Sequence, residues 1–493
     1  MWVKISIQRC GFVFLFIQAI CFAQSGVSTA VIKGNLKLTG KGDSFTVFAY
    51  KYGMEEISRK YVVAVNDGNF KVTVNEVQGP LYIRIKLPEN YSSPVQKYLI
   101  EPGDLVQISE ANNKLKYSGI GAFKFKCRDS LNKIYKGKYS RKWKDSSFLS
   151  IMPSRPVYQY LDSIGMLQLN YLLQCKNKLS PDVFNLFKID ILSEIELNKD
   201  ICLLYSNFRK DSTTNSLIKT SLADYRNKIW QELLKITKEE SKATGCSAVL
   251  YQCIISRYKI DSFVFIGKTF NLGQFVDYSV KNYSGLLLEK LITNGIYLRK
   301  SQEGAALASI IAKTTDYIKK DDFKSFIAKI NSNNTAGSKA YNFLLSDVNG
   351  KMHQLSDYRN KVVVMDFWFT GCANCIVLNS KLKKIEALFA SDSNLVFISI
   401  SKDRNKEQWV KSVKDGKYTT DNRVNLYSNG LGDSYPMFSY YSISGYPTIL
   451  TIDQNGRLCE NALDPRLDEG KSLIAVIEKH LKDADTAQNT NIR

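Results

Sequence analysis

Histidine is scarce in this sequence, whose 493 residues include only 2 histidines, 10 cysteines and 10 prolines. Ten cysteines in a chain of this length are too few for a small domain held together by disulfides. Hydrophobic residues make up 44% and charged residues 23%, which is typical of ordinary globular proteins. These values exclude a chain that is disordered, collagen-like or coiled-coil as a whole. At roughly 150 residues per domain, the length predicts about three domains.

Acidic residues are also few. The 68 lysines and arginines outnumber the 47 aspartates and glutamates, which gives a net charge of +21. A charge of this size raises the question of a nucleic-acid partner. However, the lysines are scattered along the chain, with neither zinc-finger spacing nor an RNA-binding aromatic signature. We therefore predict no nucleic-acid partner, and interpret the charge as a solvated surface that also suits an anionic membrane face.

Long apolar runs are missing after the first 23 residues. Residues 1–23 have the layout of a signal peptide, with two basic residues, a short apolar segment and a small residue, Ala23, at the end. No later stretch approaches the roughly 18 unbroken apolar residues of a membrane span. We expect cleavage after Ala23 and a location in the periplasm or cell envelope. An uncleaved anchor and a lipoprotein cleaved before Cys21 are the alternatives.

Two kinds of pattern follow in the next 300 residues. Residues 24–118 alternate apolar and polar positions between turn signals, as in Phe70–Val74, which predicts an antiparallel β-sandwich. Residues 119–335 change to a helical period and predict an all-α region. Ser180 and Pro181 form a strong helix start within it, because serine caps a helix and proline suits its first position.

Residues 336–485 alternate between strand and helix patterns, which predicts an α/β domain. Lys361–Phe369 is an almost continuous apolar run, as expected for a strand that is buried on both faces. Asn394–Ser401 is a second such strand, and Glu469–Leu481 predicts a closing amphipathic helix. We expect residues 486–493 to form a flexible tail.

Two cysteines follow the first of these buried strands directly. Cys372-Ala373-Asn374-Cys375 opens a helical pattern, so we expect Cys372 at a helix N-terminus. Unpaired backbone N–H groups and the helix dipole favour negative charge there, which lowers the pKa of a thiol. Cys375 lies one turn further on. Cys372 can therefore attack a substrate disulfide, and Cys375 can resolve the mixed disulfide.

Other interpretations of the cysteine pair remain open. A zinc site needs about four nitrogen or sulfur ligands. The chain has no second CxxC and only His353 and His480, so we expect no metal. A structural disulfide without turnover is another alternative, and it implies a non-catalytic binding or scaffold protein that carries the same module. A chance occurrence of the CxxC spacing is disfavoured, because the motif lies between a predicted strand and a predicted helix.

Three segments together resemble a known family: Val364–Cys375, Gly445–Thr448 and the hairpin at Asp453–Gly456. They are similar to the exported TlpA/ResA-type thiol–disulfide oxidoreductases, which have the thioredoxin fold, and the likeness covers about residues 336–483. The resemblance implies a thioredoxin-like enzyme that exchanges disulfides with envelope proteins and is served by an upstream redox partner. It implies no cofactor besides a redox-active Cys372–Cys375 disulfide, and leaves the direction of electron flow, the clients and the oligomeric state open.

The resemblance also assigns roles in catalysis and substrate binding. Cys372 resembles the family's nucleophile and Cys375 its resolving thiol. Pro447 matches a cis-proline that faces the cysteine pair, and a cis X–Pro bond is uncommon enough to mark a specified turn. In the family, the backbone beside this proline, here at Tyr446, pairs with an extended substrate strand.

Two supporting residues follow from the same resemblance. Asp366 matches a buried acid that assists proton movement at the resolving cysteine, and Trp368 matches an aromatic residue that flanks the site. An ordinary strand-end carboxylate and plain packing are the respective alternatives. The chain departs from the family's pattern where Asn374 and Ser380 replace two common prolines, and these changes bear on redox potential and partner choice.

The β region resembles a domain of unknown function that precedes thioredoxin modules in exported Bacteroidetes proteins. The likeness rests on the motifs at Asp67–Phe70, Glu101–Asp104 and Ser118-Gly119. It implies a cell type and a compartment but no activity.

The other cysteines are interpreted as structural. Cys127, Cys175 and Cys202 suit small buried apolar positions. Cys246 and Cys253, taken as one helix, would lie too far apart for a disulfide. Cys459, on a predicted strand, is a weaker candidate for a third redox thiol.

Overall fold

The computed structural model describes residues 28–36, 44–87, 97–111, 114–143, 155–207, 228–238, 242–262, 270–300, 306–443 and 445–490. The expected signal peptide at residues 1–23 lies outside these residues. The chain divides into two compact units. The first is Met1–Thr269 with Tyr283–Leu287, and the second is Phe270–Asn282 with Leu288–Arg493. The second unit thus takes in part of the predicted helical region as well as the α/β domain.

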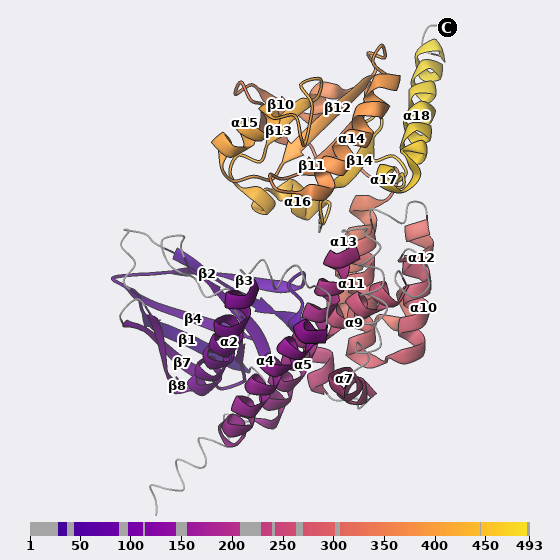
Figure 1. Cartoon of the computed structure of the whole chain (residues 1–493). Helices are drawn as coiled ribbons and strands as arrows, with labels where there is room; N and C mark the ends of the chain where they lie inside the picture. The colour runs from indigo at the N-terminus through magenta and orange to yellow at the C-terminus, as the bar shows by residue number, and fades with distance from the viewer. Residues whose placement is uncertain are drawn as a thin grey trace, which may run out of the picture. The chain divides into compact units, whose positions relative to one another are not determined.

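Two four-stranded sheets open the first unit (Figure 1). Strand β4 alternates exposed and buried residues, as its sequence predicts. Buried side chains from both sheets form one hydrophobic cluster, which includes Ile32 and Val47. The sheets have the orders β4-β1-β7-β8 and β3-β2-β5-β6. Their strands are β1 (Thr29–Asn35), β2 (Ser44–Tyr50), β3 (Ser58–Ala64), β4 (Asn69–Asn75), β5 (Leu81–Lys86), β6 (Tyr98–Ile100), β7 (Leu105–Ala111) and β8 (Lys114–Ile120).

The sheets are not antiparallel throughout. β1 pairs with β7 in parallel, with Val31 opposite Leu105, whereas the other pairs in the two sheets are antiparallel. The prediction was therefore wrong for this pair, because side-chain alternation encodes which face is buried and not the direction of the neighbouring strand. The two sheets share one hydrophobic core, and a sandwich stays a prediction.

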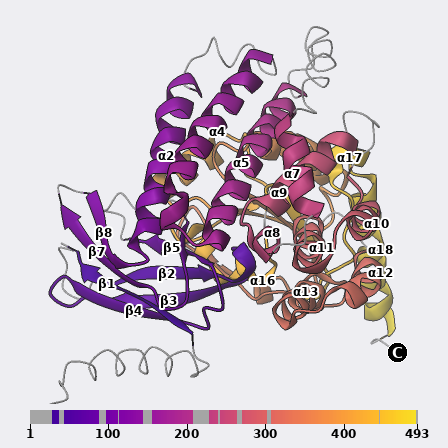
Figure 2. The ribbon, with the colours of Figure 1, turned by 90° about the horizontal axis from the view of Figure 1, so that it is seen from below.

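Helices follow the sheets, as the helical period predicts. α2, α4 and α5 pack side by side (Figure 2). Ser180 caps α5 as expected, since its Oγ accepts a hydrogen bond from the Val183 N–H at 3.2 Å and Pro181 is the first helical residue. The helices of this unit are α2 (Ala122–Trp143), α4 (Arg155–Cys175), α5 (Pro181–Asn207), α7 (Lys228–Lys238), α8 (Lys242–Cys246), α9 (Leu250–Ile260) and the short η2 (Lys51–Gly53) and η3 (Lys176–Lys178).

A buried ion cluster joins the turn between β6 and β7 to two of these helices. Lys124 Nζ on α2 donates to Glu101 Oε2 and Asp104 Oδ1, each at 2.8 Å. The Ser180 hydroxyl at the start of α5 donates to Glu101 Oε1 at 2.5 Å. The Glu101–Asp104 motif therefore connects strands with helices inside the first unit.

The second unit begins with a helical segment and continues as an α/β domain; the first three residues of α11 belong to the first unit. Its six-stranded sheet has the order β10-β9-β13-β12-β11-β14, in which β11, β12 and β13 are parallel and β14 is antiparallel to β11. The strands are β9 (Leu344–Ser346), β10 (Met352–Gln354), β11 (Val362–Trp368), β12 (Leu395–Ser401), β13 (Val424–Tyr427) and β14 (Thr448–Ile452). The helices are α10 (Leu272–Asn282), α11 (Gly285–Arg299), α12 (Ala306–Thr314), α13 (Asp321–Asn334), α14 (Ala373–Leu388), α15 (Lys406–Lys414), α16 (Pro436–Tyr440), α17 (Pro465–Asp468) and α18 (Lys471–Thr490), with η5 (Thr315–Tyr317), η6 (Leu355–Tyr358) and η7 (Gly432–Ser434).

Strand β11 lies inside this sheet and is buried at every position, which confirms the prediction from its apolar run. Because successive side chains point to opposite faces, Val363 and Met365 join one hydrophobic cluster with α16, and Val364 joins another with α14 and α18. Asp366 shares the face of Val364. The strand therefore delivers a carboxyl group to the side of the sheet that α14 covers.

The closing helix is longer than expected. α18 runs from Lys471 to Thr490, so a helix covers most of the segment 486–493 that was expected to be a flexible tail. The polar residues after Leu481 gave no apolar periodicity from which this extension could be predicted. Within the described ranges, no helix combines the length and the apolar character that crossing a membrane requires.

Replacing Lys124 with methionine should destabilise the first unit. The change leaves the buried carboxylate of Asp104 and the partly buried carboxylate of Glu101 without their cation, and breaking a buried pair typically costs about 3–5 kcal/mol. Urea unfolding followed by circular dichroism measures the loss. Lys71→Met, at an exposed position of β4, is the matched control and should change stability little; equal effects of the two variants would contradict the role of the cluster.

Candidate active site

Cys372 and Cys375 lie where strand β11 gives way to helix α14. Cys372 is the N-cap residue of α14, and its Sγ accepts a hydrogen bond from the Cys375 N–H at 3.1 Å. The two residues form a disulfide, with Cα atoms 5.3 Å apart. Both are buried, but 6% of Cys372 is exposed against 3% of Cys375. After reduction, the helix N-terminus favours the thiolate of Cys372.

The turn before Cys372 is held by Asp403. The Thr370 N–H donates to Asp403 Oδ1 at 3.0 Å, and the Thr370 hydroxyl donates to Asp403 Oδ2 at 2.6 Å. Gly371 has a φ of +100°, a conformation that glycine adopts without steric cost. Sequence reasoning missed Asp403. The available signal was its place just after β12, because the carboxyl ends of parallel β11 and β12 meet at one edge of the sheet.

Trp368 supports this turn through a second aromatic residue. It is fully buried, and its ring stacks on Tyr418 with centroids 5.1 Å apart. The Tyr418 hydroxyl accepts a hydrogen bond from the Gly371 N–H at 2.9 Å. Asn379 on α14 anchors the loop that carries Tyr418, since its side-chain amide donates to the Lys417 carbonyl at 3.0 Å. Trp368 also packs in one hydrophobic cluster with both cysteines.

Asp366 is buried in a small polar cluster. Ser399 Oγ donates to its Oδ2 at 3.1 Å, and Arg423 donates to its Oδ1 at 3.3 Å. Arg423 also pairs with Glu386 on α14. Burial raises the pKa of Asp366 to about 6, although the positive charge of Arg423 acts against the rise. Sequence reasoning missed Arg423 and Glu386, because neither stands in a recognisable motif.

The loop before β14 carries the expected cis-proline. The Tyr446–Pro447 peptide bond is cis, as the resemblance implies. The Tyr446 hydroxyl donates to Asp433 Oδ1 at 2.6 Å, and its ring meets Phe369 edge-on with centroids 5.4 Å apart. Phe369 and Tyr446 both pack against the cluster that contains the two cysteines. The structure therefore brings Tyr446 close to the disulfide.

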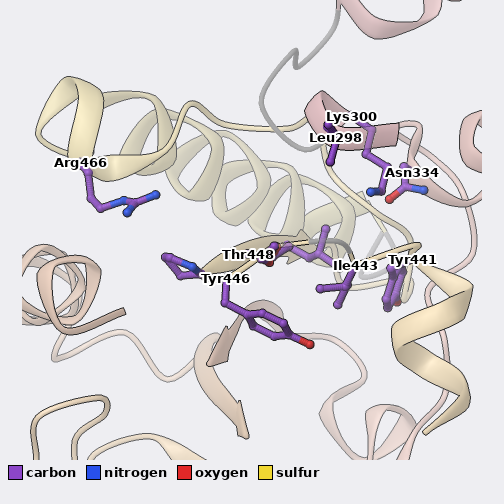
Figure 3. A pocket seen from close by; sticks show the side chains of 11 residues that line it. Leu298, Lys300, Asn334, Tyr441, Ile443, Tyr446, Thr448 and Arg466 are labelled. Atoms are coloured by element: carbon purple, nitrogen blue, oxygen red, sulfur yellow. Dashed lines mark hydrogen bonds between the residues drawn. The ribbon is translucent and has the colours of Figure 1, made fainter. Parts of the chain in front are cut away.

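A cavity of about 110 Å³ lies beside this loop. Figure 3 shows Tyr446 and Thr448 on one wall, with Lys300 and Asn334 across from them. Lys300 and Asn334 come from the helical segment of the second unit, in which the sequence gave no motif. The cavity offers room for a side chain next to the segment that is expected to bind a substrate strand.

The remaining described cysteines form no disulfide and differ from the pair in their surroundings. Burial raises the pKa of Cys202 to about 12 and the pKa of Cys459 well above its usual range. Such thiols stay protonated and are poor nucleophiles. Cys246 and Cys253 lie on two helices, α8 and α9, and not on one helix as expected. Ser247 follows the last residue of α8, and its hydroxyl accepts a hydrogen bond from the Leu250 N–H at the start of α9 at 3.1 Å.

Residues 360–458 match the family model described as thioredoxin-like. The thiol-disulfide oxidoreductase ResA of Geobacillus kaustophilus is 27% identical over 154 residues, which cover 30% of this chain and 76% of that protein. ResA of Bacillus thuringiensis is 23% identical over 141 residues, which cover 27% of this chain and 72% of that protein. The predicted resemblance of the C-terminal domain to ResA-type thiol–disulfide oxidoreductases is therefore confirmed, as is its thioredoxin-like, oxidoreductase type.

Solved structures give similar matches. The thioredoxin domain of a thiol-disulfide oxidoreductase from Bacteroides vulgatus is 28% identical and covers 29% of this chain and 96% of its own, with a TM-score of 0.26. A thiol:disulfide interchange protein from a Bacteroides species is 29% identical and covers 27% of this chain and 85% of its own, with a TM-score of 0.24. Among the residues that the structure describes, no group of three or more histidine, cysteine, aspartate or glutamate side chains could hold a metal ion.

Replacing Asp403 with alanine should loosen the turn before Cys372. Thr370 would lose its charged acceptor, and hydrogen bonds to charged groups contribute about 1.5–3 kcal/mol each. We expect unfolding free energy to fall by about 3 kcal/mol in urea titrations. Asp421→Ala removes a carboxylate that is exposed on the same domain and should be near neutral; a neutral Asp403→Ala would show that the turn does not need this support.

The pKa of Asp366 predicts a pH-dependent stability. The unfolded carboxyl titrates near its usual value of 3.8, whereas the folded one keeps its proton up to about 6. The folded chain thus binds more protons between these values, so unfolding free energy falls as pH rises through this window. The difference between the two pKa values corresponds to a loss of about 2 kcal/mol between pH 4 and pH 7. Asp366→Asn should lack this loss in urea titrations at several pH values, and parallel stability curves for both proteins would contradict the burial effect.

Proposed function

We propose that this protein exchanges disulfides with other proteins through Cys372 and Cys375. The proposal is supported by the thioredoxin-like domain and its similarity to ResA thiol-disulfide oxidoreductases. The observation that carries the proposal is the disulfide between these residues at the N-terminus of α14. A dithiol at this position is itself the redox group, so the exchange needs no further cofactor.

The proposed reaction proceeds through a mixed disulfide. In the reduced protein, the Cys372 thiolate attacks one sulfur of a client disulfide, whose S–S bond breaks while the Cys372–client bond forms. The released client sulfur takes up a proton. The Cys375 thiolate then attacks the Cys372 sulfur, which closes the ring and releases the second client thiol. The client gains two electrons and two protons; the reverse sequence oxidises a client dithiol, and an upstream redox partner restores the starting state.

The order of attack is supported by the surroundings of the two sulfurs. Cys372 is the N-cap residue and the more exposed of the pair, whereas Cys375 lies inside the first turn of α14. The helix N-terminus stabilises the anion that must attack first. Cys372 is therefore assigned as the nucleophile and Cys375 as the resolving thiol.

Asp366 is proposed to accept and return the proton of Cys375. Its pKa of about 6 suits a group that changes protonation near neutral pH. Arg423 and Ser399 hold the carboxylate in one orientation. Trp368 contributes through packing, because it belongs to the same hydrophobic cluster as both cysteines and stacks on Tyr418.

Clients are proposed to bind as extended segments. The backbone beside Tyr446 and Pro447 would pair with such a segment, a form of strand addition. The adjacent cavity would take one client side chain, with Lys300 and Asn334 at its far wall.

We assign this exchange to the periplasm or cell envelope. The support is the signal-peptide layout of residues 1–23 in the sequence. The net charge of +21 also suits contact with an anionic membrane face.

Insulin reduction with dithiothreitol as the terminal reductant tests the proposal. Cys372→Ser should lower the rate to that of dithiothreitol alone, because the attacking sulfur is gone. Cys459→Ser removes a buried thiol outside the pair and should keep full activity. Equal activity of Cys372→Ser and the unchanged protein would defeat the assignment.

A trapping experiment distinguishes an enzyme from a scaffold protein. Cys375→Ser cannot resolve the mixed disulfide, so clients from an envelope fraction should remain joined to Cys372 on non-reducing gels. Cys372→Ser/Cys375→Ser is the control and should trap none. Partners that bind the single variant only noncovalently would favour the scaffold.

A further inference from the structure

One ammonium group contacts both segments that flank the disulfide. Lys402 follows strand β12, and its Nζ lies 4.9 Å from the ring centroid of Phe369 and 4.3 Å from that of Tyr446. Phe369 belongs to the segment that leads into Cys372, and Tyr446 precedes Pro447. A cation over an aromatic face is attracted to it, and the attraction strengthens when water is partly excluded. Only 24% of the Lys402 side chain is exposed.

Asp433 completes the arrangement from a fourth segment. Its Oδ2 lies 3.1 Å from Lys402 Nζ, and its Oδ1 accepts the Tyr446 hydroxyl at 2.6 Å. Tyr446 thus makes three contacts. Its hydroxyl donates a charge-assisted hydrogen bond to Asp433, its ring lies against the ammonium group of Lys402, and the ring of Phe369 packs against it at nearly a right angle. The residue beside the cis-proline is held at three points.

The backbone of Lys402 links this cluster to the strand that leads to the cysteines. The Lys402 N–H donates to the carbonyl of Trp368 at 3.0 Å. A displacement of Lys402 would therefore move Tyr446 relative to the start of the cysteine turn. Lys402 was not among the residues that the sequence singled out.

On the basis of the proposed function, we propose that Lys402 is a positioning residue for client binding. It sets the spacing between Cys372 and the backbone edge at Tyr446 and Pro447 to which a client segment pairs. The role of Lys402 is therefore expected to affect polypeptide clients, which pair with this edge through an extended segment. A small disulfide reaches Cys372 without that pairing and does not depend on the position of Tyr446.

The test compares a protein client with a small one. The reduction of insulin and of the neutral bis(2-hydroxyethyl) disulfide is measured for the variants Lys402→Met, Lys402→Arg and Asp433→Asn. Lys406→Met is the control, because it removes an exposed charge from the same domain. Lys402→Met keeps a long, unbranched side chain but loses the positive charge. We expect its KM for insulin to rise about tenfold, with kcat for the small disulfide unchanged within about twofold.

The remaining variants separate positioning from stability. Lys402→Arg should restore the insulin KM because it keeps the cation, and Asp433→Asn should raise KM in the same direction by a smaller factor. The equilibrium of the Cys372–Cys375 pair with glutathione should not change in any variant. Equal losses with both substrates, or an unchanged insulin KM, would overturn the role of Lys402. An unchanged protein that cannot reduce insulin would instead remove the proposed function, and this inference with it.

Discussion

The short turn between β11 and α14 is the constraint on which the rest of the site depends. Asp403 accepts two hydrogen bonds from Thr370, and Gly371 adopts a backbone conformation that other residues rarely reach. Together they deliver Cys372 to the N-cap position of α14 with its sulfur against the amide of Cys375. The helix N-terminus then favours the anionic sulfur that disulfide exchange needs.

The same strand that leads to this turn carries a buried acid. β11 is buried on both faces, so Asp366 loses its hydration and its pKa rises. Arg423 and Ser399 partly offset the cost of that burial, and Glu386 balances the charge of Arg423. A charged cluster thus lies on the sheet face that α14 covers, where a proton can be held next to the helix of the cysteines.

The sequence predicted the elements that a local pattern encodes. The apolar run of Lys361–Phe369 marks a strand buried on both faces, and the CxxC that follows it marks the helix start. Asp403, Arg423 and Lys402 could not be predicted in the same way, because each acts on a partner from a distant segment. Their common signal is position, since Asp403 and Lys402 follow one parallel strand and Arg423 directly precedes the next.

The relative direction of neighbouring strands and the full length of the last helix could not be predicted from the local pattern either. Alternation of side chains in β1 reveals its buried face but does not reveal that β7 runs parallel to it. Polar residues after Leu481 continue α18 without an apolar face. The cis bond before Pro447 was anticipated only through the family resemblance.

The most direct measurement is a redox titration of the folded protein in glutathione buffers, with the state of Cys372 and Cys375 read by mass spectrometry after alkylation. A redox-active pair should pass reversibly from disulfide to dithiol in a two-electron transition while circular dichroism stays constant. A disulfide that persists at every buffer ratio until the protein unfolds would identify it as structural and contradict the account.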